Sequence, residues 1–296
     1  MGTADVGVEN SVQICYTLPN KEPKGDPMNK AMYGAIIGDM VGSIYERNPI
    51  RTKDFPFFQR DSHFTDDTVM TLAVYRALKA YDRDCDQAQA LQNFKKALID
   101  EMRTLGRAYP RAGYGRKFIW WLFGDNPAPY GSYGNGSAMR VSPVGDFAQS
   151  LDEALTLSKA SAEVTHDHPE GIKGAQAVAA AIYLARNGAD KDAIRKYVHE
   201  NFYDMDFSLS ETWADYKFDA SCQGSVPQAI MCFLEGASFE DVIRNCIWLG
   251  GDCDTTAAIA GGIAGAYYGV DEWMVEEMKG RLGELGEGIG VDPGRK

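Results

Sequence analysis

Apolar and polar positions along most of the chain follow the spacing of α-helices. In residues 68–81, apolar or small side chains recur three and four positions apart, so they would share one face of a helix. Similar patterns predict helices over 174–186, 239–248 and 255–268, and Gly188 and Gly269 follow two of these as C-caps. The mostly apolar or small segment 33–45 predicts a buried helix.

Strand signals are scarce by contrast. Clean two-residue alternation, the signature of a half-buried strand, is hard to find, and glycines and prolines gather between the predicted helices. Residues 1–29 lack periodicity and contain a turn-rich run at 20–27, which predicts an N-terminal extension. Residues 30–296 are expected to form a single all-α domain.

Composition narrows the class of protein. The chain has 296 residues, 45% hydrophobic and 24% charged, which are ordinary values for a globular protein. It has no apolar run of the roughly 20 residues needed to span a bilayer and no secretory signal, so a cytoplasmic location without membrane contact is expected. Six cysteines without a C-x-x-C pair predict free thiols rather than a zinc site.

The net charge of −12 bears on the partners. A surface this acidic repels nucleic acid and anionic lipid, and no Lys/Arg cluster is visible along the sequence to offset it. General nucleic-acid binding is therefore not expected. An anionic substrate would need a local positive site, for example bound metal ions.

Two acidic clusters stand directly before predicted helices. The first is Thr-Asp-Asp-Thr at 65–68, and the second is Gly-Gly-Asp-Cys-Asp-Thr-Thr at 250–256. Taken singly, each is most simply a helix cap with acids in the first turn. If the two helix starts meet, however, four carboxylates share one pocket, and their repulsion requires protons or cations. Because the donors are all oxygen, such a pocket favours Mg²⁺, Mn²⁺ or Ca²⁺ over zinc.

Three other segments could carry chemistry. The Gly-rich stretch 131–140 is either an ordinary surface loop or a loop whose backbone N–H groups and Ser132 hydroxyl bind phosphate. In Gly-Asp-Met-Val-Gly-Ser-Ile-Tyr-Glu at 38–46, the glycines could allow close helix packing, and Glu46 alone reads as a solvated acid. Thr-His-Asp-His-Pro at 165–169 is most simply a turn before the next helix.

These five segments, in this order, resemble the ADP-ribosylglycohydrolase family, which includes the dinitrogenase reductase-activating glycohydrolase and the animal ADP-ribosyl-acceptor hydrolases. The motifs are G-D-x-x-G-x-x-x-E, T-D-D-T, S-Y-G-N-G-x-A-M-R, H-x-H-P and G-G-D-x-D-T, and the resemblance runs from about Tyr33 to about Gly269. It implies an orthogonal helical bundle with a central binuclear metal site, holding two divalent cations, Mg²⁺ before Mn²⁺.

The resemblance also assigns residues. It implies that the two metals are held by Thr65, Asp66, Asp67, Asp252, Asp254 and Thr255. It implies that substrate is bound by Ser132, Tyr133, Gly134, Asn135, Gly136, Met139 and His166. The catalytic carboxylates would be Glu46, Asp66, Asp67 and Asp252. Cys253 departs from the serine expected between the two aspartates, and it is not a ligand position.

The expected reaction is hydrolysis of the glycosidic bond at C1″ of an ADP-ribosylated protein or other acceptor, with ADP-ribose as product. One alternative is an ADP-ribose-binding relative with weak or lost catalysis. The other is a metal phosphohydrolase of the HD type, for which His166 and Asp167 supply a literal His-Asp pair.

Overall fold

The computed structural model describes residues 29–286, which contain helices and no strand, with one isolated antiparallel bridge between Gly134 and Ser221. The α-helices are α1 (Lys30–Gly42), α2 (Asp66–Ala77), α3 (Gln87–Ala108), α4 (Arg116–Phe123), α5 (Gly136–Met139), α6 (Ser142–Phe147), α7 (Leu151–Glu163), α8 (Pro169–Arg186), α9 (Lys191–Asn201), α10 (Leu209–Thr212), α11 (Cys222–Glu235), α12 (Phe239–Leu249), α13 (Cys253–Tyr268) and α14 (Glu272–Leu282), and the 3₁₀ turns are η2 (Leu78–Ala80) and η3 (Gly283–Gly286). The predicted all-α single domain is confirmed. The predicted extension, residues 1–29, lies outside the described residues except for Asn29.

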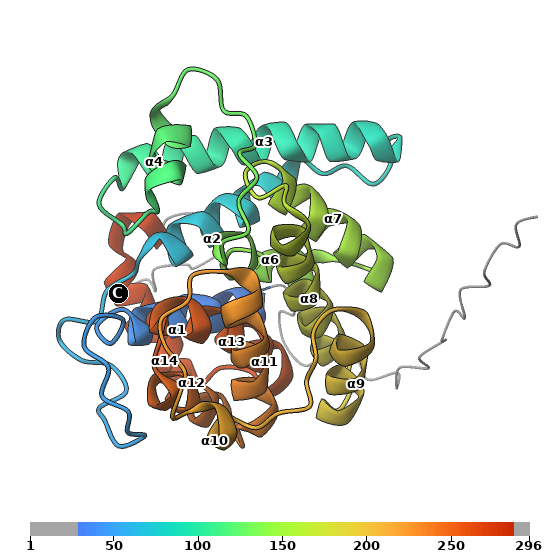
Figure 1. Cartoon of the computed structure of the whole chain (residues 1–296). Coiled ribbons are helices and arrows are strands. Elements are labelled where there is room, and N and C mark those ends of the chain that lie inside the picture. Colours follow the sequence, from blue (N-terminus) through green and yellow to red (C-terminus); the bar gives the residue numbers. More distant parts are fainter. Residues whose placement is uncertain (1–28, 287–296) are drawn as a thin grey trace, which may run out of the picture.

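The helices cross one another at steep angles (Figure 1). Helices α3 and α4 lie at one end of the molecule, α10 and α12 lie at the opposite end, and α1 and α13 run between them. No helix within residues 29–286 is both long and apolar enough to cross a membrane.

All five predicted helices are present, with shifted ends. The helix expected over 33–45 is α1, which begins and ends three residues earlier. The helix expected over 68–81 is α2, and its last turn is the 3₁₀ turn η2. The helix expected over 174–186 begins five residues earlier, because His168 caps it and Pro169 occupies its first position. The helix expected over 239–248 is α12, and the one over 255–268 is α13.

Helices α1 and α13 pack with their backbones nearly in contact. A Cβ at Gly34 would lie 2.1 Å from the carbonyl oxygen of Gly261, and one at Gly38 would lie 2.0 Å from that of Ala257. Only glycine leaves room for such an approach. Gly38, in the first motif, therefore allows close helix packing, as the sequence analysis expected.

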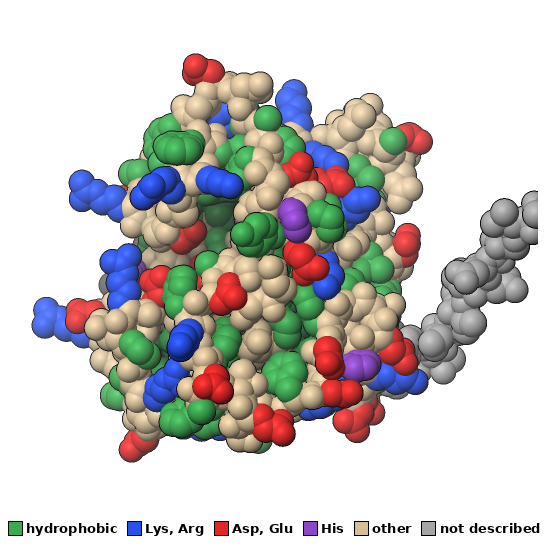
Figure 2. Space-filling view, in the orientation of Figure 1, with side chains coloured by type: hydrophobic (Ala, Val, Ile, Leu, Met, Phe, Trp, Pro, Cys, Tyr) green, Lys and Arg blue, Asp and Glu red, His purple; other side chains and the backbone are tan. Residues whose placement is uncertain are grey.

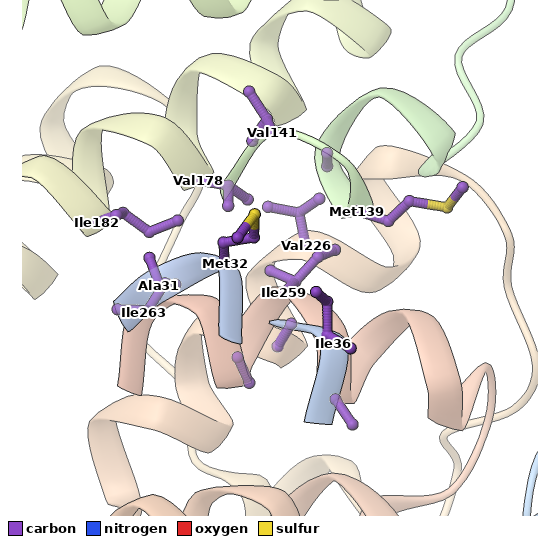
Figure 3. Close-up of a cluster of buried hydrophobic side chains, with 14 of the residues drawn as sticks. Ala31, Met32, Ile36, Met139, Val141, Val178, Ile182, Val226, Ile259 and Ile263 are labelled. Carbon is purple, nitrogen blue, oxygen red and sulfur yellow. The ribbon is translucent and has the colours of Figure 1, made fainter. Parts of the chain in front are cut away.

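Around this pair lies one continuous apolar core. Met32 of α1 lies beside Val178 of α8 and Val226 of α11, and Ala31 of α1 lies beside Ile182 of α8 (Figure 3). These five side chains are fully or almost fully buried. Burial of this kind supplies most of the stability of a helical domain, so it fixes α1 and α13 relative to α8.

The start of α1 is held by a buried acid from α6. Asp146 Oδ2 accepts hydrogen bonds from the backbone N–H groups of Ala31 and Met32, at 3.0 and 3.1 Å. Burial raises the pKa of Asp146 to about 7. The carboxyl thus caps α1 at the end of the helix away from the acidic motifs.

Candidate active site

A cleft of about 1160 Å³ opens between the N-terminal ends of α2 and α13. Figure 2 shows the hollow on this face of the molecule. Its walls come from the segment 43–64 after α1, the segment 111–117 before and within α4, the Gly-rich loop and residues 218–220. All six residues predicted as metal ligands line this cleft.

The first acidic cluster begins α2. Thr65 is the N-cap and accepts a hydrogen bond from the backbone N–H of Asp67. The first cluster therefore does cap a helix, as the simpler interpretation of the sequence predicted. Asp66 is tied to the next wall of the cleft, because its N–H donates to the carbonyl oxygen of Ala112 at 2.7 Å. Its carboxylate reaches the cleft beside Gly113.

Asp39 of α1 organises this helix start, and the sequence reasoning missed it. Thr65 donates to Asp39 through its hydroxyl, at 2.7 Å, and through its N–H, at 2.9 Å. Thr68 does the same through its N–H, at 3.0 Å, and its hydroxyl. With both oxygens of Asp39 accepting, its carboxylate positions α2. The available signal was a single acid inside the otherwise apolar stretch 31–42.

The second cluster begins α13. Gly250 and Gly251 have φ values of +82° and +79°, a conformation that favours glycine, as the diglycine predicted. This turn brings Asp252 and Asp254 to the same side. Asn135 donates its side-chain N–H to Asp252 Oδ2 at 2.8 Å, and the Thr255 hydroxyl donates to Asp67 Oδ2 at 3.2 Å. The two helix starts therefore meet, which was the condition set by the sequence.

The carboxylates form two groups that share one member. Ligand atoms of Asp39, Asp67 and Asp254 lie within 4.8 Å of one another, and so do those of Glu46, Asp252 and Asp254. Both groups are all-oxygen. Two groups joined through Asp254 are the arrangement that a pair of hard divalent cations would require.

The buried carboxylates of the two groups repel one another, and a proton or a cation among them would relieve this repulsion. Burial and mutual repulsion raise the pKa of Asp39 to about 6 and hold those of Asp66, Asp67 and Asp252 well above their ordinary range. Asp67 Oδ1 is buried and accepts no hydrogen bond. An unpartnered buried carboxylate oxygen beside other acids fits a cation site.

Glu46 lies in the cleft, where the sequence alone would have made it a solvated helix-end acid. Its side chain is 31% exposed, and within residues 29–286 its one ion pair is a long one, 4.0 Å, to Arg47. Partial burial and the nearby Asp254 raise its pKa. Glu46 thus lies beside Asp252 and Asp254 in the cleft, and its catalytic role stays a prediction.

The Gly-rich loop supplies another wall of the cleft. The structure uses some of the donors expected to bind phosphate: the N–H of Gly134 donates to Ser132 Oγ at 3.2 Å, and the N–H of Asn135 donates to the carbonyl oxygen of Ala220 at 2.8 Å. Ser132, Gly134, Asn135, Gly136, Met139 and His166 line the cleft. Tyr133 does not; it is 52% exposed and its ring packs edge-on against His168.

His166 is a buried, neutral ring facing this loop. Burial and the neighbouring Arg140 hold its pKa well below the usual value. Arg140 donates to Thr165 Oγ1 at 3.0 Å, and this hydroxyl lies 2.7 Å from His166 Nδ1. We infer that the hydroxyl donates to Nδ1, which leaves the ring proton on Nε2, against Gly136.

The His-Asp pair of the HD-type alternative does not form a metal site in the described residues. His166 belongs to neither carboxylate group near the cleft. Asp167 accepts a hydrogen bond from the N–H of Gly131 at 2.7 Å, which ties the loop to the start of α8. The pair therefore has a structural use.

Arg51 joins the segment that carries Glu46 to the turn before Asp252. Within residues 29–286 it is the one non-glycine residue with positive φ, at +48°. Its guanidinium donates to the carbonyl oxygens of Trp213 and Tyr216 and lies over the Trp213 ring. Tyr216 in turn packs so closely on Gly251 that a Cβ there would lie 2.6 Å away. The two positions cannot move independently without breaking these contacts.

The folded chain also gathers basic side chains that are scattered in the sequence. Arg47, Arg111, Arg116 and Lys117 all line the cleft. This corrects the expectation that the acidic chain has no basic cluster. Residues 47 and 111–117 stand far apart in the sequence, and they reach one cleft only in the folded chain, where the N–H of Asp66 at the start of α2 donates to the carbonyl oxygen of Ala112.

Comparison with known proteins identifies the family of the chain. The profile of the ADP-ribosylglycohydrolase family matches residues 23–290. ADP-ribosylhydrolase ARH3 of Mus musculus is 28% identical and ADP-ribosylarginine hydrolase Tri1 of Pseudomonas putida is 29% identical; these alignments cover 81% and 88% of this chain and 83% and 76% of those proteins. ADP-ribosyl-[dinitrogen reductase] glycohydrolase of Rhodospirillum rubrum is 28% identical, over 82% of this chain and 85% of that protein.

A solved structure described as an ADP-ribosylglycohydrolase-related protein complex matches the fold with a TM-score of 0.62. The match has 24% identity and covers 86% of this chain and 95% of that one. With the family profile spanning nearly the whole described chain, the protein belongs to the ADP-ribosylglycohydrolase family and is an enzyme of that class.

Proposed function

We propose that the cleft hydrolyses the bond between C1″ of ADP-ribose and an acceptor, using two divalent cations, Mg²⁺ before Mn²⁺. The observation that carries this proposal is the pair of all-oxygen carboxylate groups joined through Asp254. The relatives named above are hydrolases of ADP-ribosylated substrates by their descriptions, which supports the same substrate class here.

Thr65, Asp66, Asp67, Asp252, Asp254 and Thr255 would hold the cations. The bare Oδ1 of Asp67 and the shared position of Asp254 support this set, whereas the oxygens of Asp39 are already occupied by Thr65 and Thr68. When bound, such cations would orient the 2″- and 3″-hydroxyls of the ribose and supply positive charge among the clustered carboxylates.

The residues of the chain would do the rest. A carboxylate, with Glu46 the first candidate and Asp66, Asp67 or Asp252 the others, takes a proton from water as the water oxygen bonds to C1″. The bond from C1″ to the acceptor breaks, and the carboxylate passes the proton it took to the acceptor atom that leaves. Nearby carboxylates stabilise the positive charge that develops at C1″.

The Gly-rich loop would hold the diphosphate end. The Ser132 hydroxyl beside Gly134 is a donor for the diphosphate, and the inferred Nε2–H of His166 beside Gly136 is a donor for the distal ribose. Because His166 stays neutral, this contact would not depend on pH near neutrality. The acidic centre then lies between the diphosphate and the segment 111–117, to which Asp66 is bonded.

The test is release of ADP-ribose from arginine-, serine- and nucleobase-linked substrates, with Mg²⁺, with Mn²⁺ and after chelation. We expect release from at least one linkage, loss of turnover on chelation and recovery when cation is restored. Cation should also raise the melting temperature, because it binds the folded state alone. No release from any linkage, or full turnover by cation-free protein, would contradict the proposal.

A further inference from the structure

Helix α4 presents an apolar and basic face to solvent at the mouth of the cleft. Trp120 is 69% exposed, Phe123 is 53% exposed and Ile119 is 38% exposed. Arg116 and Lys117 begin the same helix and are exposed. In Figure 2, hydrophobic and basic side chains stand together in the region of α4, next to the hollow. We call these five residues the α4 face.

The α4 face is held firmly from behind. Phe118, Trp121 and Leu122 are buried, and the rings of Phe118 and Trp121 stack with centroids 5.4 Å apart. Two arginines of α3 bind the end of α4: Arg107 donates to the carbonyl oxygen of Leu122 at 2.9 Å, and Arg103 donates to that of Gly124. A rigid helix that leaves a tryptophan in water is typical of a surface that another molecule covers.

The α4 face continues into the cleft on one particular side. Arg116 and Lys117 line the cleft together with Arg111, and the backbone of Ala112 is bonded to Asp66. The Gly-rich loop approaches the acidic centre from the other side, through the hydrogen bond between Asn135 and Asp252. If the loop takes the diphosphate, the acceptor leaves C1″ toward α4.

Charge selects the class of partner. Arg111, Arg116 and Lys117 form no ion pair with any described residue, although the chain carries a net charge of −12. A long polyanion such as nucleic acid would meet repulsion beyond this small basic area. A short acidic stretch of a protein would not, and exposed Trp, Phe and Arg are the residue types that dominate protein–protein interfaces.

We infer that the α4 face docks an acidic segment of the ADP-ribosylated protein beside the modified residue, and so selects acceptors by their surroundings. This inference rests on the proposed function of the cleft. Arg116 and Lys117 bind the negative charges of the acceptor, and Trp120 and Phe123 cover its apolar side chains. A free ADP-ribosylated amino acid is too small to reach the face.

The experiment compares three substrates of the linkage that the wild type cleaves: a free ADP-ribosylated amino acid, a modified peptide with acidic flanks and one with neutral flanks. We expect Arg116→Glu/Lys117→Glu to raise KM for the acidic peptide by about tenfold, with kcat unchanged, since each exposed charge pair contributes modestly. Trp120→Ala should raise KM for both peptides by about tenfold. KM for the free amino acid should stay within about twofold.

Salt provides a second readout. KM of the wild type for the acidic peptide should rise with ionic strength, and that dependence should disappear in Arg116→Glu/Lys117→Glu. A matched pair of single variants serves as control. Lys117→Glu on α4 is compared with Lys96→Glu on α3, on the same three substrates. Both lysines are exposed on helices without an ion pair, but Lys96 does not line the cleft. Lys96→Glu should leave all three substrates unaffected.

Two results would overturn the inference. Equal losses on all three substrates would mean that the basic residues bind ADP-ribose itself, and unchanged KM for both peptides would mean that the face binds no protein segment. An ADP-ribosylated oligonucleotide, tested as a fourth substrate, adds a third such result: a variant effect confined to it would assign the face to nucleic acid instead. If the wild type releases ADP-ribose from none of the substrates, the proposed function fails, and this inference fails with it.

Discussion

The paired helices α1 and α13 are built differently at their two ends. In the middle and toward one end, Gly34 and Gly38 meet the backbones of Gly261 and Ala257, and the surrounding side chains are apolar. At the other end, the same two helices bring Asp39 and Asp254 together, where burial and the neighbouring Asp254 raise the pKa of Asp39. One end gains stability from close packing, whereas the other accumulates repulsion that only a proton or a cation relieves.

This difference shows how one helix pair can separate stability from chemistry. Substitutions at the packed end should unfold the protein without touching the reaction. Substitutions at the acidic end should stop the reaction while the fold persists. Four variants test this division. A substitution at the packed end that lowers kcat, or one at the acidic end that unfolds the protein, would show that the two ends are coupled.

The largest effect is expected from Asp254→Ala. It removes the carboxylate that the two acidic groups share, so activity should be abolished, and the rise of melting temperature with Mg²⁺ should be lost. In cation-free buffer the variant should be at least as stable as the wild type, because a repelling charge has gone. Thermal melts with and without Mg²⁺ decide this. A variant unfolded under both conditions would mean that Asp254 is needed for the fold itself.

Glu46→Gln should come next, with kcat lowered by about 10²–10⁴-fold, the usual contribution of a general base. The amide keeps the size of the side chain but loses its charge and basicity. Mg²⁺ affinity measured on the same variant separates two roles: unchanged affinity identifies a base, and weakened affinity identifies a ligand beside Asp252 and Asp254. Turnover within about threefold of wild type would remove Glu46 from the reaction.

Gly38→Ala tests the packed end. The new Cβ would lie 2.0 Å from the carbonyl oxygen of Ala257, so α1 and α13 must separate, at a cost of about 3 kcal/mol. Denaturant unfolding measures this cost, and kcat per folded molecule should remain near that of the wild type. Gly280→Ala in α14 is the control, because nothing lies within 4 Å of its Cβ; it should be neutral or slightly stabilising. Equal costs at the two positions would refute the packing argument.

The smallest effect is expected from Arg51→Ala, which frees the segment carrying Glu46 from the loop that supports Gly251. Misplacing a reacting group slightly should lower kcat by about tenfold. Arg51→Lys should recover only part of this, since lysine cannot donate to two carbonyl oxygens in the same fork. Arg60→Ala, an exposed residue of the same segment, is the control. Stopped-flow or steady-state kcat that is unchanged in Arg51→Ala would show that the segment is held by other contacts.

The helices could be predicted where local pattern alone determines them. Residues 239–248 and 255–268 are examples, because capping residues and apolar spacing agree there. Amphipathic α3, although 22 residues long, was not singled out. The start of α8 was placed too late, because His168 caps the helix through its side chain and Pro169 begins it, which is a local chemistry that apolar spacing does not report.

The candidate site was predictable only in part for a related reason. The aspartates of 65–68 and 250–256 stand out as repeated acids at helix starts. Asp39 does not, because its role depends on where α2 lies relative to α1, and a single acid in an apolar helix gives no hint of that. The basic residues of α4 were likewise invisible, since their meeting with the cleft is a property of the tertiary fold.

Gly42, like Gly34 and Gly38, lies where α1 touches α13, and this contact limits how the sequences of related proteins can change. A Cβ at that position would lie 2.5 Å from Cα of Asp254, so the backbone itself demands glycine there, whatever the side chain of residue 254 is. A descendant that abandoned catalysis would remain under pressure to keep Gly38 and Gly42 in order to fold, while Asp254 and Glu46 could be exchanged freely. In a related sequence, the glycines of the first motif therefore indicate membership of the fold family. Asp254 and Glu46 indicate whether the protein has kept its catalytic site.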